Sequence, residues 1–177
     1  MTMKSIKRIL VLLITISFIN CNDSDNSPSY PLNYENIAGL YGIESLKADV
    51  QTTISVSGIP VTASANAVGD TFQVDMIINA DRTYSINGEY RIITTTRIPG
   101  TSPLTEEEIV VVDEDGTYVI NENSINFTDP NAEFLTGVLN VTVFNEDSFT
   151  LAQELEESDS STNTSVSADL AVGFIRK

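Results

Sequence analysis

The chain has 177 residues, with 25 acidic and nine basic side chains that give a formal net charge of −16. It contains no histidine and a single cysteine. Such an acidic chain is unsuited to nucleic acid, because phosphates are neutralised by Lys and Arg. The composition also excludes a histidine-dependent catalytic triad and a His/Cys zinc site.

The N-terminal segment has the features of a secretory signal peptide. Lys4, Lys7 and Arg8 precede an apolar run at residues 9–19, which is shorter than the about 20 residues of a transmembrane helix. We therefore predict a signal peptide at residues 1–20. Its removal deletes three positive charges and no acid, so the net charge falls from −16 to −19.

The rest of the chain divides into a tether and one domain. Residues 21–36 are rich in Asn, Ser, Asp and Pro and have no hydrophobic periodicity, which predicts a flexible acidic tether. Residues 37–177 are long enough to bury one core without disulfides. We therefore predict a single domain there.

Within this domain, apolar and polar residues alternate as they do in half-buried β-strands. The clearest example is a pair of segments joined at residues 79–82. The apolar positions of this pair are Phe72, Val74, Met76, Ile78, Tyr84, Ile86, Gly88, Tyr90 and Ile92. The last strand, residues 166–175, repeats the pattern with Val166, Ala168, Leu170, Val172 and Phe174.

Turn residues separate the other segments. We expect turns at residues 58–60, 113–116, 121–123 and 145–147, and an acidic Ser/Thr loop at residues 156–164. The turn at residues 113–116 ends in Asp-Gly, a strong hairpin signal. About nine strands and no amphipathic helix predict an all-β fold, an antiparallel up-and-down meander closed into a β-barrel. A β-sandwich is the alternative.

No group of residues indicates catalysis. Nothing selects a working pair among the 25 acids, so we expect a protein that is not an enzyme and has no cofactor. Asp113, Glu114 and Asp115 could suggest calcium, but the residues after Gly116 continue as a strand instead of supplying further ligands. We expect a solvated hairpin tip and no metal site.

Aromatic residues on the inward face are the candidate ligand site. They are Tyr41, Phe72, Tyr84, Tyr90 and Phe149. A small barrel either holds one small apolar ligand or fills its interior with side chains. The same aromatic residues fit both alternatives.

Cys21 directly follows the apolar run and resembles the lipidation cysteine of bacterial lipoproteins. In the family pattern, Leu, a small residue and Gly or Ala precede the cysteine, whereas here Phe18, Ile19 and Asn20 do. Looser patterns followed by acidic residues resemble those of Bacteroidota lipoproteins exported to the surface. The resemblance implies that Cys21 carries acyl chains such as palmitate; a secreted protein with an unpaired cysteine is the alternative.

Three short motifs resemble the lipocalin-like domains of Bacteroidota lipoproteins. They are Gly39-Leu40-Tyr41, Asn79-Ala80-Asp81-Arg82-Thr83-Tyr84 and Asp115-Gly116-Thr117-Tyr118. Tyr41 stands where the family has Trp, and Arg82 where it usually has Gly. The resemblance implies that Arg176 stacks on Tyr41 as a cation–π pair, the alternative being a surface arginine in a frayed tail.

Together these resemblances imply a lipoprotein of the cell envelope, anchored to the outer membrane by its N-terminal lipid. Its barrel would bind a small hydrophobic ligand. The alternative is a non-enzymatic interaction or glycan-binding module in an envelope complex. Neither involves nucleic acid.

Overall fold

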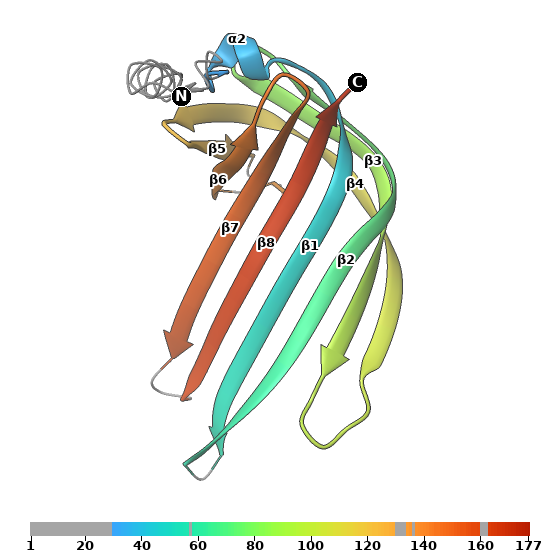
Figure 1. Cartoon of the computed structure of the whole chain (residues 1–177), viewed down its shortest axis with the longest axis vertical. Helices are drawn as coiled ribbons and strands as arrows, with labels where there is room; N and C mark the ends of the chain where they lie inside the picture. Colours follow the sequence, from blue (N-terminus) through green and yellow to red (C-terminus); the bar gives the residue numbers. More distant parts are fainter. Residues whose placement is uncertain (1–29, 57, 130–133, 136, 160–162) are drawn as a thin grey trace, which may run out of the picture.

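The computed structural model describes residues 30–56, 58–129, 134–135, 137–159 and 163–177, which form a closed antiparallel β-barrel (Figure 1). Each strand pairs with the next along the chain, and the last pairs with the first. The all-β, up-and-down barrel prediction is confirmed, with eight strands instead of nine. The elements are α2 (Tyr34–Ile37), β1 (Gly39–Val56), β2 (Ile59–Ile78), β3 (Thr83–Arg97), β4 (Leu104–Asn121), β5 (Ser124–Thr128), β6 (Gly137–Phe144), β7 (Ser148–Asp159) and β8 (Thr164–Arg176).

Long strands explain the lower count. Next to Gly69, β2 contains a β-bulge, where its register with β3 shifts between Asp70 and Gln73. Thr71 adopts φ 53° at this bulge. A bulge inserts an extra residue without ending the strand, so β2 runs from Ile59 to Ile78 as one strand. β1 is likewise one strand, and its ladder with β2 is continuous from Leu46 to Val56.

The hairpin predicted at residues 113–116 is wrong, because β4 continues through this segment in ladder with β3. Gly116 pairs with Tyr84 there. A Cβ atom on residue 116 would lie 2.5 Å from the Thr128 carbonyl oxygen and 3.1 Å from Cε1 of Tyr84. The glycine therefore serves close packing of neighbouring strands and not a turn.

The turn at residues 79–82 is confirmed. It contains Arg82, which stands where the lipocalin-like pattern usually has Gly. Arg82 has φ 75°, a backbone conformation that glycine adopts more readily. Its guanidinium carbon lies 4.8 Å from the centre of the Tyr34 ring. This stacking holds α2 against the end of the barrel.

The turn at residues 145–147 is also confirmed. Asn145 Oδ1 accepts hydrogen bonds from the backbone N–H groups of Asp147 and Ser148, both at 2.9 Å. The turn at residues 121–123 joins β4 to β5 as expected. The loop predicted at residues 156–164 is shorter, because β7 extends to Asp159 and β8 begins at Thr164.

The core lies at the end of the barrel that carries α2 and the chain's C-terminus, which we call the closed end. Inward residues of every strand meet there. The largest fully buried side chains are Tyr41, Tyr118, Phe149, Phe174, Ile37, Met76, Ile78, Ile86, Ile125, Leu135, Leu151 and Val74. Residues 30–36 fall in the predicted tether, yet Leu32 and Tyr34 pack against this core.

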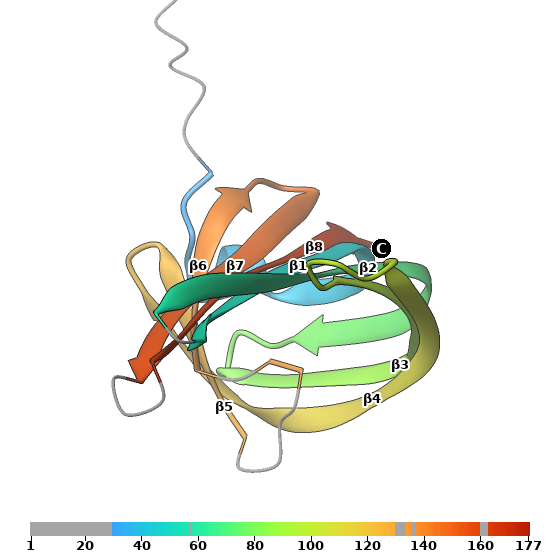
Figure 2. The same ribbon diagram turned by 90° about the horizontal axis from the view of Figure 1, so that it is seen from below.

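The opposite end of the barrel is built differently, and we call it the split end. Only the long strands reach it, because β5 and β6 are short (Figure 1). β5 pairs with β4 only from Thr117 to Asn121, and β6 pairs with β7 only from Phe149 to Ala152. The remainders of β4 and β7 each have one strand partner among the described residues. Figure 2, seen from this end, shows β3 and β4 opposite β1, β2 and β8.

Candidate functional site

The five aromatic residues predicted to bind ligand fall into two groups. Tyr41, Tyr84 and Phe149 are at most 2% exposed and lie in the closed end. The Phe149 ring contacts the Tyr41 ring edge-on at 4.9 Å between centroids and stacks on Phe174 at 4.7 Å. These three aromatic side chains pack against protein atoms and fill the closed end.

Phe72 and Tyr90 lie together at the boundary between the two ends, with ring centroids 6.0 Å apart. Tyr90 also contacts Phe134, at 5.8 Å between centroids. A hollow of about 270 Å³ adjoins Tyr90, Phe134 and residues 110–114. Of the five predicted residues, Tyr90 therefore borders open space.

Glu114 secures the β5–β6 connection beside this hollow. Its carboxylate accepts the backbone N–H of Phe134 at 2.6 Å and that of Leu135 at 3.3 Å. The side chain is buried, and two amide donors offset the cost of removing its charge from water. Sequence reasoning assigned Glu114 to a solvated hairpin tip, and that assignment is wrong because it lies inside the barrel.

The inner face of the split end is a surface that the sequence reasoning did not single out. Beyond buried Leu46, the same face of β1 continues through Ala48, Val50 and Thr52. Val50 pairs with Ala65 of β2 on one side and Ala168 of β8 on the other. The surrounding residues of this inner face are Ala63, Ala67, Val166 and Leu170, all half-buried.

Larger apolar side chains border this inner face. Ile54, Leu104 and Leu155 are 42%, 58% and 45% exposed. On β1, β2 and β8, small and mostly apolar side chains therefore occupy the centre of this inner face and larger apolar ones its border, whereas the inner face of β4 carries Glu106 and Glu108. The alternation of Ala63, Ala65 and Ala67 with polar neighbours was the sequence signal for it.

The Tyr41–Arg176 pair occurs as the resemblance implied. The Arg176 guanidinium carbon lies 4.9 Å from the centre of the Tyr41 ring, and Nη2 donates to the Tyr41 hydroxyl at 2.6 Å. Burial raises the pKa of Tyr41, and the charge of Arg176 opposes this rise. The arginine is therefore not in a frayed tail.

Arg176 also binds three backbone carbonyls. Its guanidinium donates to Asn36 at 2.7 Å, Ala38 at 2.8 Å and Glu146 at 2.8 Å. These contacts join the segment before β1 and the β6–β7 turn to the final strand. Arg176 therefore acts as a structural clasp at the closed end.

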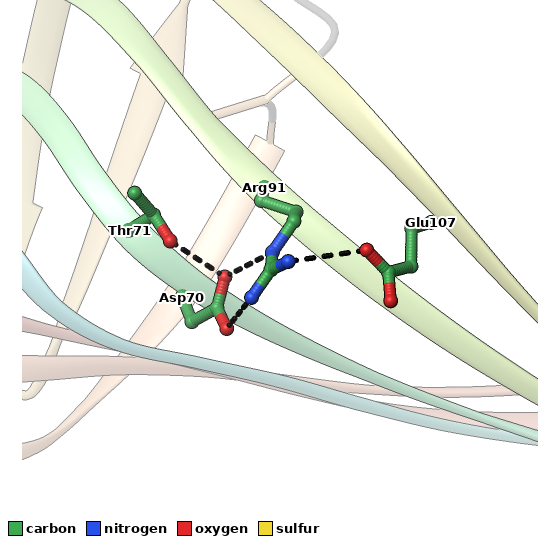
Figure 3. Close-up of polar contacts among 4 residues, drawn as sticks. All are labelled: Asp70, Thr71, Arg91 and Glu107. Carbon is green, nitrogen blue, oxygen red and sulfur yellow. Dashed lines mark hydrogen bonds and ion pairs between the residues drawn. The ribbon is translucent and has the colours of Figure 1, made fainter.

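On the outer surface, an ion-pair group connects β2, β3 and β4 beside the bulge (Figure 3). Arg91 donates to both carboxylate oxygens of Asp70, at 2.8 and 2.7 Å, and to Glu107 at 3.1 Å. The hydrogen bond from Arg91 lowers the pKa of Asp70. All three side chains are over a third exposed, so the group adds little stability.

Several predictions concern residues outside the described ranges. The signal peptide, Cys21 and most of the tether belong to residues 1–29 and stay predictions. In the described ranges no three His, Cys, Asp or Glu side chains are grouped closely enough to hold a metal ion. No helix in those ranges has the length and hydropathy needed to cross a membrane.

The fold and the inner surface define the protein as a closed eight-stranded antiparallel β-barrel of the lipocalin-like kind. Comparisons with protein-family models, curated proteins and solved structures gave no match to this chain.

Proposed function

We propose that this chain is a non-catalytic lipoprotein of the cell envelope, held at the outer membrane by acyl chains on Cys21. Its barrel binds a small apolar ligand on the inner face of the split end. The observation that carries the proposal is the half-buried row of Ala and Val side chains on β1, β2 and β8. The resemblance of Cys21 and its flanking residues to lipoprotein signals supports the anchor.

The packing of the barrel favours the split end as the binding region. Aromatic rings fill the closed end, and the apolar inner surface below them is only half-buried. A ligand there would cover apolar surface at about 25 cal/mol per Å² removed from water. Tyr90 and Phe72, at the boundary, would contact the end of the ligand.

Native mass spectrometry on the chain expressed at full length, and purified as the cell processes it, tests the ligand. We expect excess mass from a co-purified apolar molecule that is lost on denaturation. Ala65→Glu places a charge on the inner face and should abolish this mass, whereas Ser64→Glu, on the opposite face of the same strand, should retain it. A ligand-free mass that persists after incubation with envelope lipids would contradict the binding proposal.

The anchor is tested separately. We expect the N-terminal peptide of the membrane-bound protein to begin at Cys21 and to carry acyl chains, as measured by mass spectrometry. Cys21→Ser should release the protein from membranes, because two or more acyl chains are needed for stable anchoring. Membrane retention of the Cys21→Ser variant would contradict lipidation at this residue.

A further inference from the structure

β4 has a long free edge in the split end. From Leu104 to Asp113 it pairs with β3 on one side, and among the described residues no strand pairs with it on the other. At about 3.3 Å per residue, these ten residues present about 33 Å of strand edge whose outward backbone groups pair with no described strand. An edge of this length can accept another strand.

This edge lacks lysine, proline and a bulge, three of the features by which proteins prevent pairing, and its charged side chains are all acidic. Ile109 and Val111 on its outer face are 57% and 72% exposed. Val110 and Val112 complete a run of four β-branched residues, which favours an extended partner.

The charges beside the edge define the partner. Glu106, Glu107, Glu108 and Asp113 flank the β-branched run, and Arg91 is the basic side chain that pairs with one of them. The part of β7 after Ala152, which among the described residues pairs only with β8, carries Glu154, Glu156 and Glu157. A strand that binds here faces acids on both sides of an apolar centre.

We propose that the free edge of β4 binds an extended, basic segment of another polypeptide by strand addition. Its backbone would pair with residues 104–113, its apolar side chains would cover Ile109 and Val111, and its Lys or Arg side chains would face the flanking acids. Directly opposed side chains of opposite charge stabilise such a ladder.

Charge disfavours a second copy as the occupant. Antiparallel pairing of two β4 edges, centred on Val110, would place Glu107 opposite Asp113 of the other copy. Like charges directly opposite destabilise a ladder, and each chain has a net charge of −16. Residues 21–29 of the same chain contain Asp23 and Asp25 and no basic residue, so they match the acidic edge of β4 no better than a second copy does.

The test uses a synthetic peptide as the probe. Its sequence, Lys-Val-Val-Thr-Ile-Lys-Lys-Lys, places Lys opposite Asp113 and opposite Glu106, Glu107 and Glu108 in an antiparallel ladder. Two control peptides carry N-methyl groups on alternate amides. One is methylated on the amides that face β4 in the ladder, and the other on the amides that face away from it. Methylation on the amides that face β4 removes every N–H that the peptide donates to β4, places methyl groups against that edge and leaves the charge unchanged.

Binding is measured by calorimetry and by hydrogen exchange on the chain expressed at full length. We expect the unmodified peptide to protect amides within residues 104–113, and one methylated peptide to bind at least about tenfold more weakly. Raising the salt from about 50 to 500 mM should weaken binding, because exposed charges are screened.

Matched variants locate the site. Ile109→Lys combined with Val111→Lys should reduce peptide affinity by at least about tenfold, because lysine repels the probe and protects strand edges. Val68→Lys combined with Ile77→Lys makes the same charge change at exposed apolar residues of β2, which has strand partners on both sides, and should leave affinity unchanged. Circular dichroism verifies that both variants are folded.

The outcomes separate this proposal from others. Equal binding of all three peptides, protection outside residues 104–113, or no binding at millimolar concentration would each overturn it. Concentration-dependent dimers that disappear in the β4 variant would overturn the choice of a basic partner. The inference is independent of the apolar ligand, so a ligand-free barrel that binds the peptide would leave it intact.

Discussion

The two ends of this barrel use the same strands in opposite ways. At the closed end, all eight strands contribute inward side chains, and Arg176 joins the N-terminal segment to β8. At the split end, β5 and β6 are missing, inward positions of β1, β2 and β8 hold mostly alanine and valine, and one edge of β4 has no strand partner among the described residues. The comparison teaches that the closed end supplies most of the stability, because its large buried side chains stabilise the fold. The split end leaves the inner surface and the strand edge that the proposed binding would use.

The largest expected effect is the loss of a closed-end aromatic. Phe149→Ala removes a ring that is 0% exposed and should lower the free energy of unfolding by about 3–5 kcal/mol, through lost burial and a cavity. Val111→Ala at the split end should change it by less than about 0.5 kcal/mol. Chemical denaturation of both variants measures the contrast, and equal losses would contradict the assignment of stability to the closed end.

Arg176→Ala should cost about 3 kcal/mol. It removes a charged donor from three carbonyls and from the Tyr41 hydroxyl, and charge-assisted bonds are the strong ones. Lys177→Ala is the control, because the Lys177 side chain forms an ion pair with exposed Asp75 on the surface. Thermal unfolding measures both variants, and an unchanged melting temperature for Arg176→Ala would show that the clasp is dispensable.

Alkaline pH should destabilise the closed end. Burial raises the pKa of Tyr84 and Tyr118 to about 12, with nearby Glu114 adding to the effect at Tyr84. Both folded-state pKa values exceed the unfolded value of about 10, so this stability is complete below pH 10 and is lost as pH rises towards 12. We expect tyrosine ionisation, followed by absorbance, to coincide with unfolding; ionisation of all tyrosines near pH 10 in the folded protein would contradict it.

Replacing the same two tyrosines by phenylalanine should give different results. The Tyr118 hydroxyl donates to the Asn79 carbonyl at 2.8 Å, so Tyr118→Phe should cost about 1 kcal/mol. The buried Tyr84 hydroxyl has no hydrogen-bond partner within the described part of the chain. Tyr84→Phe should therefore be neutral or stabilising in urea unfolding, and a loss as large as that of Tyr118→Phe would reveal a partner.

The smallest effect belongs to the outer ion-pair group. Arg91 lowers the pKa of Asp70, so this contribution is present above the unfolded value of about 3.9 and is lost as pH falls through the lower folded value. Asp70→Asn should slightly reduce stability at pH 7 and leave it unchanged at pH 2. Urea midpoints at the two pH values measure this, and an equal loss at both would exclude the ion pair as the cause.

Local sequence patterns predicted much of the closed end. The alternation of Tyr84, Ile86 and Tyr90 identified the inward face, since a strand has a period of two. The turns at residues 79–82, 121–123 and 145–147 were placed correctly, and in the first and last of them Asn and Asp side chains form hydrogen bonds across the turn. The Tyr41–Arg176 pair came from resemblance, because 135 residues separate the two and no local pattern links them.

The candidate site was harder to predict. Glycine at residue 116 and the acids before it give the same local signal for a turn and for close strand packing, and the approach of Thr128 decides between them. The free edge of β4 depends on β5 being short. That property belongs to strand pairing and not to β4's own residues.

By itself, the sequence determined an all-β meander, its inward faces and most of its turns, because these follow from residue periodicity and turn chemistry over a few neighbours. Only the tertiary structure decided that eight strands close, that aromatic rings fill one end, and that the other end keeps an apolar inner face and an open edge. Those features depend on which distant strands pair and where each pairing stops.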